Sequence, residues 1–390
     1  MNRTATIVYS LAFILLMLGL ALSSLPALLS FSAAKDTPVL NGKLAQSFEK
    51  HYDQAFSLKA FGTNLWAAID YSLFEEGRPG VVVGRGDWLF TDEEFKPATQ
   101  PRQVQDNWAL IEAVQAELKR RDIELVLLLL PAKARLYPEQ LGRAQPVAAH
   151  SQLYSQALAR MQDESLPGPD LLPVWRQAKL QAPIFLRTDT HWTPYGAEVA
   201  AQSLAAYLFE RGSLQPGEER FVTAPGKTQT HKGDLLSFLP LEPYFAGLQP
   251  PSEPLQQRQT ALADGQDDSS AAALFDEQPP SLALVGTSYS ANPKWNFAGA
   301  LKQALGSDLL NFAEDGHGPL VPMLRLLQSD PAQNAGLRLV IWEFPERYLL
   351  LPSDLSSFDA AWLQRLQQAK DSGGAPRLAH LATSANGAAQ

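Results

Sequence analysis

An aspartate and a histidine two residues apart are the first side chains in the sequence that could perform acid–base chemistry. Asp189 and His191 lie within residues 187–196, just before a segment of strong helix formers. Thr193 is a natural N-cap and Pro194 suits the first helical position, so we expect extended backbone before them. In extended backbone, residues i and i+2 point to the same side. The spacing predicts a general base, an imidazole oriented by a carboxylate.

Two other interpretations of this pair stay open. In the first, Asp189 is a capping residue and His191 is a surface histidine. In the second, both bind a metal ion. The metal site is the weaker alternative, because no third ligand is close in the sequence and the chain contains no cysteine. We expect neither a metal nor a cofactor.

A serine directly after a predicted buried strand is the candidate nucleophile. Residues 282–285 read Leu-Ala-Leu-Val, and the sequence Gly-Thr-Ser follows at once and ends at Ser288. Many hydrolases raise their nucleophile from the end of a strand in this way. The segment is not the Gly-x-Ser-x-Gly elbow, because Ser290 stands where the second glycine would be. Ser290 is therefore the rival nucleophile.

Two other histidines are rival candidates for the general base. His231 lies in the segment His-Lys-Gly-Asp-Leu, and His317 lies in Glu-Asp-Gly-His-Gly. Neither has the combination of a neighbouring carboxylate and a helix start that surrounds His191. We therefore rank His191 first.

Charged residues at two predicted strand ends are weaker site candidates. Lys133 and Arg135 follow an apolar run, and Glu343, Glu346 and Arg347 follow another. Open α/β sheets bind ligands at the carboxyl ends of their strands. A solvated loop at the first position and a structural salt bridge at the second are the default alternatives.

Apolar runs of strand length alternate with segments of helix length along the chain. Strands are predicted at 123–130, 183–186, 282–285, 309–312 and 337–342, and helices at 103–121, 145–162, 194–208, 296–305 and 320–328. Nearly continuous apolar runs beside helices are typical of parallel strands covered on both faces. The pattern predicts an α/β sandwich with a central, mostly parallel sheet.

The flanking segments carry weaker structural signals. Residues 40–76 are predicted to be helical, and residues 81–90 to form a hairpin. Residues 211–233 are polar and loop-like, and residues 249–280 are rich in Pro, Gln, Asp, Ser and Ala, which predicts a long surface excursion. Residues 372–390 are expected to form a disordered tail.

The amino terminus has the composition of a membrane segment. Residues 1–35 carry Arg3 and then no charge until Lys35, and the apolar run between them is long enough to span a bilayer of roughly 30 Å. We expect an uncleaved signal-anchor over residues 1–35, which leaves a domain of residues 36–371 outside the cytoplasm. Cleavage near residues 32–34 is the alternative. The absence of cysteine suits an oxidising compartment.

The body of the chain is acidic. The whole sequence carries a formal net charge of −9, and removing the two positive charges of Arg3 and Lys35 leaves −11 for the rest. This balance argues against nucleic acid as a partner and, more mildly, against tight general binding of polyanions.

The Asp-Thr-His-Trp segment and the strand-borne Gly-Thr-Ser together resemble the SGNH-like acetyltransferases of alginate biosynthesis. The resemblance covers most of the chain, including the anchor, the hairpin with Trp88-Leu89-Phe90, the strand end at Lys133 and residues 231–235. Asp and His precede Ser, which is similar to the permuted order of this family and unlike ordinary SGNH esterases. No part of the chain resembles the carbohydrate-binding module that one relative in the family carries.

The resemblance implies an SGNH-hydrolase-like fold with a Ser-His-Asp triad. Ser288 would form an acetyl-enzyme, His191 would take its proton, and Asp189 would hold the imidazole. The backbone N–H of Ser288 and a second donor would stabilise the oxyanion. The implied activity is O-acetyl transfer in the modification of the exopolysaccharide alginate in the periplasm.

The same resemblance implies partners and a location. A membrane-bound O-acyltransferase would supply acetyl groups, other alginate acetylation and export proteins would act alongside, and alginate would be met directly or through a partner. The protein would lie in the inner membrane facing the periplasm, or in the periplasm if the anchor is cleaved. An acetylesterase with the same triad and a non-catalytic subunit of the export complex are the alternatives. The presence of all three triad residues argues against the second.

Overall fold

The computed structural model describes residues 3–33, 38, 41–263, 280–330 and 334–372. It divides into two compact units, one of Met1–Arg78 with Ser237–Pro250 and one of Pro79–Leu236 with Pro251–Gln390. The boundary expected at residue 35 lies outside the described residues. The tail expected at 372–390 also does, apart from Ser372, which ends a helix.

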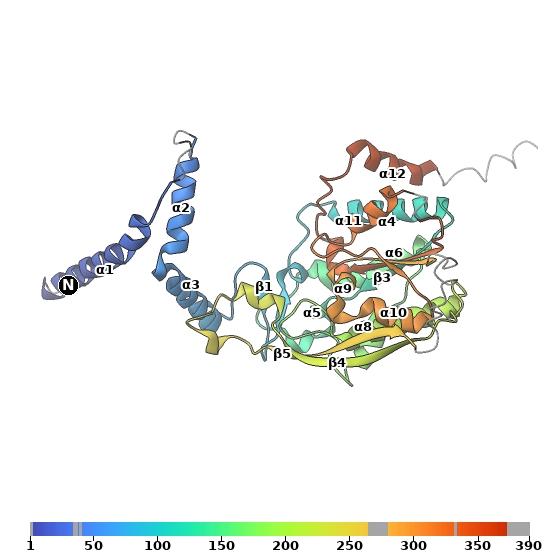
Figure 1. The fold of residues 1–390 in the computed structure, drawn as a ribbon, viewed down its shortest axis with the longest axis horizontal. Helices are drawn as coiled ribbons and strands as arrows, with labels where there is room; N and C mark the ends of the chain where they lie inside the picture. The colour runs from blue at the N-terminus through green and yellow to red at the C-terminus, as the bar shows by residue number, and fades with distance from the viewer. Residues whose placement is uncertain (1–2, 34–37, 39–40, 264–279, 331–333, 373–390) are drawn as a thin grey trace, which may run out of the picture. The chain divides into compact units, whose positions relative to one another are not determined.

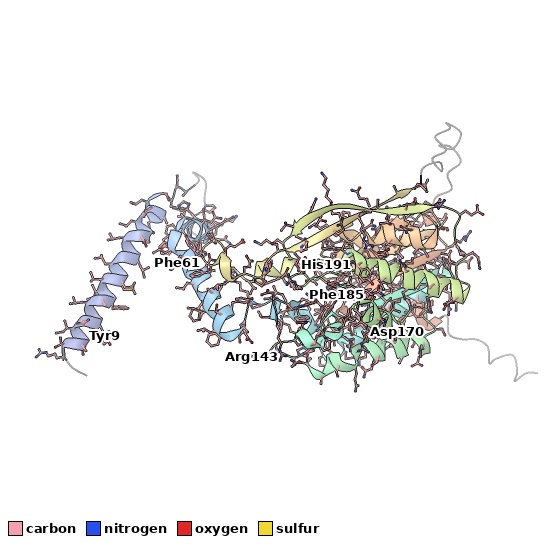
Figure 2. The ribbon with its side chains drawn as sticks, turned by 90° about the horizontal axis from the view of Figure 1, so that it is seen from below. Tyr9, Phe61, Arg143, Asp170, Phe185 and His191 are labelled. Atoms are coloured by element: carbon pink, nitrogen blue, oxygen red, sulfur yellow. The ribbon has the colours of Figure 1, made fainter. Side chains whose placement is uncertain are left out.

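The first unit is mainly helical (Figure 1). Its helices are α1 (Arg3–Leu29), α2 (Lys43–Ala55) and α3 (Ser57–Ile69), and a π-helical turn, Asp70–Phe74, follows. The predicted helical segment is therefore confirmed in type but is broken at Phe56, whose backbone is extended. Within the described part of the chain, α1 alone is long and apolar enough to cross a membrane. Tyr9 projects from it and is exposed (Figure 2).

A parallel four-stranded sheet forms the centre of the second unit. Its strands are β3 (Glu124–Leu130), β6 (Leu282–Val285), β7 (Leu310–Asn311) and β8 (Leu339–Pro345), and their order across the sheet is β3-β8-β6-β7. All three neighbouring pairs are parallel. Parallel strands place their carboxyl ends at one edge, so the residues that follow β3, β6 and β8 gather there.

Helices cover both faces of this sheet (Figure 1). One layer contains α7 (Leu171–Ala178), α8 (Pro194–Arg211) and α10 (Phe297–Leu305), and the other contains α4 (Gln103–Arg120), α6 (Ala148–Asp163), α11 (Leu320–Gln328) and α12 (Ala360–Ser372). The even-numbered residues 126–130 of β3 pack in the first core, and the odd-numbered residues 125–129 pack in the second. A strand buried on both faces needs no polar alternation, as its sequence predicts. The predicted α/β sandwich is confirmed.

Two stretches expected to lack regular structure form an antiparallel ribbon. β4 (Phe221–His231) pairs with β5 (Glu253–Leu262) over most of its length, and His231 pairs with Glu253. Most of β4 is exposed, and most of β5 is exposed or half-buried, so few of their side chains are apolar and the apolar alternation that signals a strand is absent. The backbone ladder and cross-strand side-chain hydrogen bonds, such as those between Thr223 and Thr260 and from Thr228 to Gln256, hold the two strands together. Residues 264–279 of the expected excursion lie outside the described residues.

The strand expected at 183–186 is wrong. This segment is not part of the sheet, and Phe185 forms only an isolated antiparallel bridge with Trp192. The chain reverses between these residues, because Leu186 N–H donates to the His191 carbonyl and Thr193 N–H donates to the Ile184 carbonyl. An apolar run of four residues is too short to distinguish a sheet strand from a buried turn.

The remaining predicted elements are close to those observed. The hairpin consists of β1 (Val81–Val83) and β2 (Leu89–Thr91), and the predicted helices appear as α4, α6, α8, α10 and α11. The sequence did not predict α7, α12 or the one-turn helices α5 (Lys133–Leu136) and α9 (Ser288–Ala291).

Candidate active site

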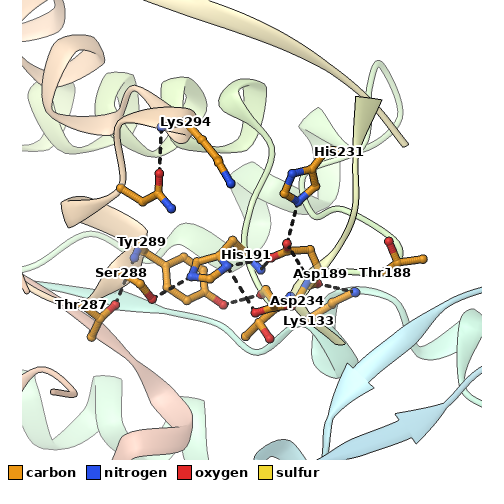
Figure 3. Close-up of polar contacts among 12 residues, drawn as sticks. Lys133, Thr188, Asp189, His191, His231, Asp234, Thr287, Ser288, Tyr289 and Lys294 are labelled. Carbon is orange, nitrogen blue, oxygen red and sulfur yellow. Dashed lines mark hydrogen bonds and ion pairs between the residues drawn. The ribbon is translucent and has the colours of Figure 1, made fainter. Parts of the chain in front are cut away.

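The structure brings Ser288, His191 and Asp189 into one hydrogen-bonded chain (Figure 3). Ser288 Oγ lies 2.7 Å from His191 Nε2, and His191 Nδ1 lies 2.7 Å from Asp189 Oδ1. The nucleophile and base are within hydrogen-bond reach and a third group orients the base, which is the geometry required to activate a serine. Ser288 and His191 are partly exposed, whereas Asp189 is buried.

Asp189 reaches His191 by a route that differs from the expected one. The chain bends through residues 187–191 instead of being extended. Asp189 Oδ1 accepts the backbone N–H of His191 at 2.9 Å as well as the ring nitrogen. This is an Asx turn, in which an aspartate bonds the backbone two residues on. The expectation of extended backbone is therefore wrong, although the two side chains do meet.

The second oxygen of Asp189 is held by His231. His231 Nε2 lies 2.7 Å from Asp189 Oδ2, which also accepts the backbone N–H of Asp234 at 3.1 Å. Burial alone would raise the pKa of Asp189, but hydrogen bonds from the two histidines outweigh it and hold this pKa well below the usual range. These hydrogen bonds therefore favour the charged carboxylate form of Asp189.

The rival bases occupy other positions. His231 contacts the carboxylate and not the serine, so among the described residues His191 is the histidine bonded to Ser288. His317 is exposed and lies 3.8 Å from Glu314. The short sequence His-Lys-Gly-Asp shares a site with Asp189 because β4 ends there, a proximity that no local pattern reveals.

Aromatic rings enclose the catalytic histidine candidate. His191 stacks on Trp295, with ring centroids 5.0 Å apart and planes inclined by 22°, and its ring centroid lies 4.8 Å from that of Tyr289. Tyr289 donates its hydroxyl proton to the Thr190 carbonyl at 2.6 Å. These contacts hold the imidazole ring of His191 in its orientation.

Glu343 organises the turn that carries the nucleophile. Its buried carboxylate accepts the Thr287 N–H at 2.7 Å, the Thr287 hydroxyl at 3.0 to 3.1 Å and the Ser290 hydroxyl at 3.0 Å. Burial raises the pKa of Glu343 against the effect of these donors. Glu343 lies inside β8 and not after it, and the expected salt bridge at this residue is wrong. Ser290 is buried and committed to this carboxylate, whereas Ser288 faces His191.

Lys133 is buried beneath the turn that carries Asp189. Its Nζ donates to the carbonyl oxygens of Leu89, Arg187 and Asp189 at 2.6, 2.9 and 2.9 Å. Burial lowers the pKa of Lys133 to about 8, even though nearby carboxylates oppose this shift. The solvated loop expected here is wrong, and the side chain connects the hairpin to the site.

Arg135 and Arg347 also serve as internal ties. Arg135 donates through Nε and Nη2 to the two oxygens of Glu346 at 2.7 and 2.9 Å. Arg347 donates to Glu93 at 2.8 Å and to the Tyr289 hydroxyl at 3.3 Å. The default of a structural salt bridge therefore holds for Glu346 and Arg347, and neither arginine is a free cation at the mouth of the site.

A further glutamate that the sequence did not single out supports the Asp189 turn. Glu253 accepts the backbone N–H of Arg187 at 2.9 Å, and the N–H and hydroxyl of Thr188 at 2.8 and 2.9 Å. Its position in a polar, Gln-rich strand carries no local signal of this role. Only the pairing of β4 with β5 brings it here.

The metal alternative can be tested on the donor set. Ligand atoms of Asp189, His191 and Asp234 lie within 4.8 Å of one another. Both oxygens of Asp189 are engaged by four donors, and the free ring nitrogen of His191 faces Ser288. A cation would displace these bonds, so the residues fit a hydrogen-bonded triad better than a metal site.

Comparison with known proteins gives a consistent result. A family model described as the SGNH hydrolase-like domain of the acetyltransferase AlgX matches residues 81–346. The probable alginate O-acetylase AlgJ of Pseudomonas aeruginosa is 56% identical over 390 residues, covering 99% of this chain and 98% of that protein. The corresponding protein of Azotobacter vinelandii is 53% identical over 372 residues, covering 95% of each. The solved O-acetyltransferase domain of Pseudomonas putida AlgJ is 49% identical with a TM-score of 0.69, covering 75% of this chain and 100% of that chain.

Proposed function

The chain belongs to the AlgX family of SGNH hydrolase-like acetyltransferases, and we propose that it acetylates hydroxyl groups of alginate through Ser288, His191 and Asp189. It is an O-acetyltransferase by its relatives and its fold. The observation that carries the assignment of residues is the unbroken hydrogen-bond chain from Ser288 Oγ through the His191 ring to Asp189 Oδ1.

The first half-reaction follows from this geometry. Ser288 Oγ attacks the carbonyl carbon of the acetyl donor while His191 Nε2 takes the serine proton, and Asp189 stabilises the imidazolium. The tetrahedral intermediate collapses when the C–O or C–S bond to the donor group breaks and the leaving group takes the proton from His191. The product is an acetyl ester on Ser288. In the second half, an acceptor hydroxyl attacks the acetyl carbon and gives its proton to His191. The bond from this carbon to Ser288 Oγ then breaks, and Oγ takes the proton back from His191, which releases the acetylated acceptor and restores the free serine.

Two features supply the electrostatic part of catalysis. Ser288 begins α9, and among the described residues its backbone N–H has no hydrogen-bond partner, so it is available to the oxyanion. Glu343 fixes the Thr287 backbone directly before it. Oxyanion stabilisation of this kind depends on donors that are already in place before the reaction.

Alginate is the proposed acceptor because the relatives at 56% and 53% identity are named alginate O-acetylases. The alternative, an acetylesterase, uses the same triad and differs only in passing the acetyl group to water. Incubation with a small acetyl ester, with and without oligomannuronate, separates the two. Acetylated oligomer detected by mass spectrometry supports transfer. Release of acetate at a rate that oligomer does not change, with no acetylated oligomer, would establish an esterase.

The location and partners form part of the same proposal. We place residues 1–35 as an uncleaved signal-anchor in the inner membrane, with residues 36–371 acting on the periplasmic side. The apolar α1 helix is consistent with such an anchor. A membrane-bound O-acyltransferase would then supply the acetyl group, and other alginate-modification proteins would hold or export the polymer. Loss of alginate acetylation on Ser288→Ala in cells that retain the full-length protein would argue against a purely non-catalytic subunit.

A further inference from the structure

The end of the β4–β5 ribbon is hydrogen-bonded to the turn that carries Asp189. His231 and Glu253 are paired directly across the two strands. Glu253 accepts hydrogen bonds from the backbone of Arg187 and Thr188, and His231 Nε2 bonds the side chain of Asp189. One cross-strand pair therefore contacts three consecutive residues of the turn.

Close backbone packing holds the ribbon end in this place. Gly233 lies so near Thr188 that a Cβ atom on it would be 2.1 Å from the Thr188 carbonyl oxygen. The next residue, Asp234, donates its N–H to Asp189 Oδ2 and accepts the Thr190 N–H at 2.8 Å. The segment that leaves β4 thus follows the turn on both sides of Asp189.

We propose that His231 is a positioning residue of the reaction, which locks the rotation of the Asp189 carboxylate so that Oδ1 stays aimed at His191 Nδ1. The inference rests on the proposed triad. Asp189 Oδ1 receives both bonds from His191, and Oδ2 receives the bonds from His231 and Asp234. With the His231 bond lost, the buried carboxylate keeps only one donor on Oδ2 and gains freedom to rotate about its Cβ–Cγ bond.

The surroundings of His231 suit a residue that donates a fixed hydrogen bond to Asp189, and not a second general base that accepts a proton from substrate. Its ring is buried, and its edge meets Trp295 at a centroid distance of 5.6 Å with planes at 85°. The same Trp295 stacks on His191. Neither proton transfer by His231 nor contact with substrate is required, because the side chain acts through Asp189.

Two amide variants of His231 test whether a donor that reaches Asp189 Oδ2 is needed, or only a polar side chain at this position. His231→Gln places an amide N–H near the position of Nε2, whereas the amide of His231→Asn is too short to reach Asp189 Oδ2. We expect the Gln variant to keep kcat for a small acetyl ester within about threefold of the wild type, and the Asn variant to lose roughly 10- to 100-fold in kcat, as for a lost hydrogen bond to a charged group. KM should change little in either, because His231 does not contact the ester.

Two further measurements distinguish positioning from general destabilisation. The rate of Ser288 modification by a sulfonyl fluoride should fall in parallel with kcat, since it reports serine activation without any sugar acceptor. In an Asp189→Asn background, His231→Asn should have almost no further effect on kcat, because the two residues act as one unit. His150→Asn is the matched control, since His150 is a buried histidine of the same unit that bonds the Lys96 carbonyl.

The outcomes are distinct. Equal losses in His231→Gln and His231→Asn, or additive losses with Asp189→Asn, would overturn the positioning role. So would unchanged kcat in His231→Asn. Sulfonylation that persists in Ser288→Ala would instead refute the proposed nucleophile. A variant with a lowered unfolding midpoint but full kcat per folded molecule would show that His231 is only structural.

Discussion

The Nε2 atom of His191 lies 2.7 Å from the Oγ atom of Ser288, although 97 residues separate them in the chain. His191 comes from a turn outside the sheet, and Ser288 comes from the end of β6. The stacking of His191 on Trp295, which follows Ser288 in the chain, holds the two segments together. The contact between His191 Nε2 and Ser288 Oγ is the basis for assigning the nucleophile and the base.

We expect Ser288→Ala to abolish both ester cleavage and the covalent acetyl-enzyme, because Ser288 alone of the two nearby serines bonds His191. Ser290→Ala should retain both activities. It should lose about 1 kcal/mol of stability, since Glu343 loses one hydrogen-bond donor. Intact-protein mass spectrometry after mixing with an acetyl ester reads the adduct directly. An adduct on Ser288→Ala that disappears in Ser290→Ala would move the nucleophile by two residues.

Asp189→Asn should lower kcat by about four orders of magnitude, the loss seen when a triad aspartate can no longer hold the correct imidazole tautomer. The variant should remain folded, because Asn can still accept a hydrogen bond from the His191 backbone. Kinetics with a small acetyl ester and urea unfolding measure the two properties separately. Activity close to that of the wild type would remove Asp189 from the triad.

The pKa of Lys133, lowered by burial to about 8, gives a stability prediction. An unfolded lysine titrates near about 10.4, so between about pH 8 and about pH 10 the unfolded chain binds more protons than the folded one. The contribution of Lys133 to the free energy of unfolding should therefore rise with pH in this window. Below this pH window, Lys133 is charged in the folded protein, and burying that charge lowers the free energy of unfolding.

Urea unfolding of wild type and Lys133→Met from about pH 7 to about pH 10 tests this sign. The difference in unfolding free energy, wild type minus variant, should increase with pH. Lys179→Met is a control, since Lys179 is a partly exposed lysine that bonds the Leu136 carbonyl and Glu139. A difference for Lys133→Met that stays flat or falls with pH would show that Lys133 is not held with a lowered pKa.

Binding of long alginate chains to this protein alone should be weak. The chain after Lys35 carries −11, the whole-chain value of −9 less the charges of Arg3 and Lys35. Lys133, Arg135 and Arg347, which could have formed a basic groove, are bonded to internal partners. Repulsion should be strongest at low salt and should relax as the Debye length falls to about 8 to 10 Å.

Calorimetry with oligomannuronates of increasing length at two salt concentrations measures this affinity. We expect weak binding that does not tighten with length and is not weakened by salt. Micromolar affinity that increases with length and decreases with added salt would reveal a polyanion groove and contradict the prediction.

The amino-terminal segment should remain attached to the mature protein. The α1 helix contains 27 residues, and Arg3 is its only charged residue. Its uncharged part is therefore longer than the apolar region of a cleaved signal peptide. Membrane fractionation followed by mass spectrometry of the intact chain tests the prediction. Soluble protein that begins near Ala34 would contradict it.

The sequence by itself determined the features that depend on local chemistry. The Leu-rich run of β3 predicted a strand buried on both faces, the Leu-Ala-Leu-Val of β6 predicted a buried strand, and Thr193-Pro194 predicted the start of a helix. A serine directly after a strand indicated a nucleophile, and an aspartate two residues before a histidine indicated an oriented general base. For this reason the α/β class and the three candidate site residues could be predicted from short patterns.

The tertiary structure decided which distant groups act on those residues. His231 and Glu253 reach the Asp189 turn because two exposed polar strands pair there, and exposed polar strands carry no hydrophobic period. The tertiary structure also distinguishes Ser288 from Ser290 as the nucleophile. Glu343, more than fifty residues later in the chain, binds the Ser290 hydroxyl and leaves that of Ser288 to His191. Local sequence sets backbone preference and burial, whereas the partner of a buried polar group depends on which strand ends meet at one edge of the sheet.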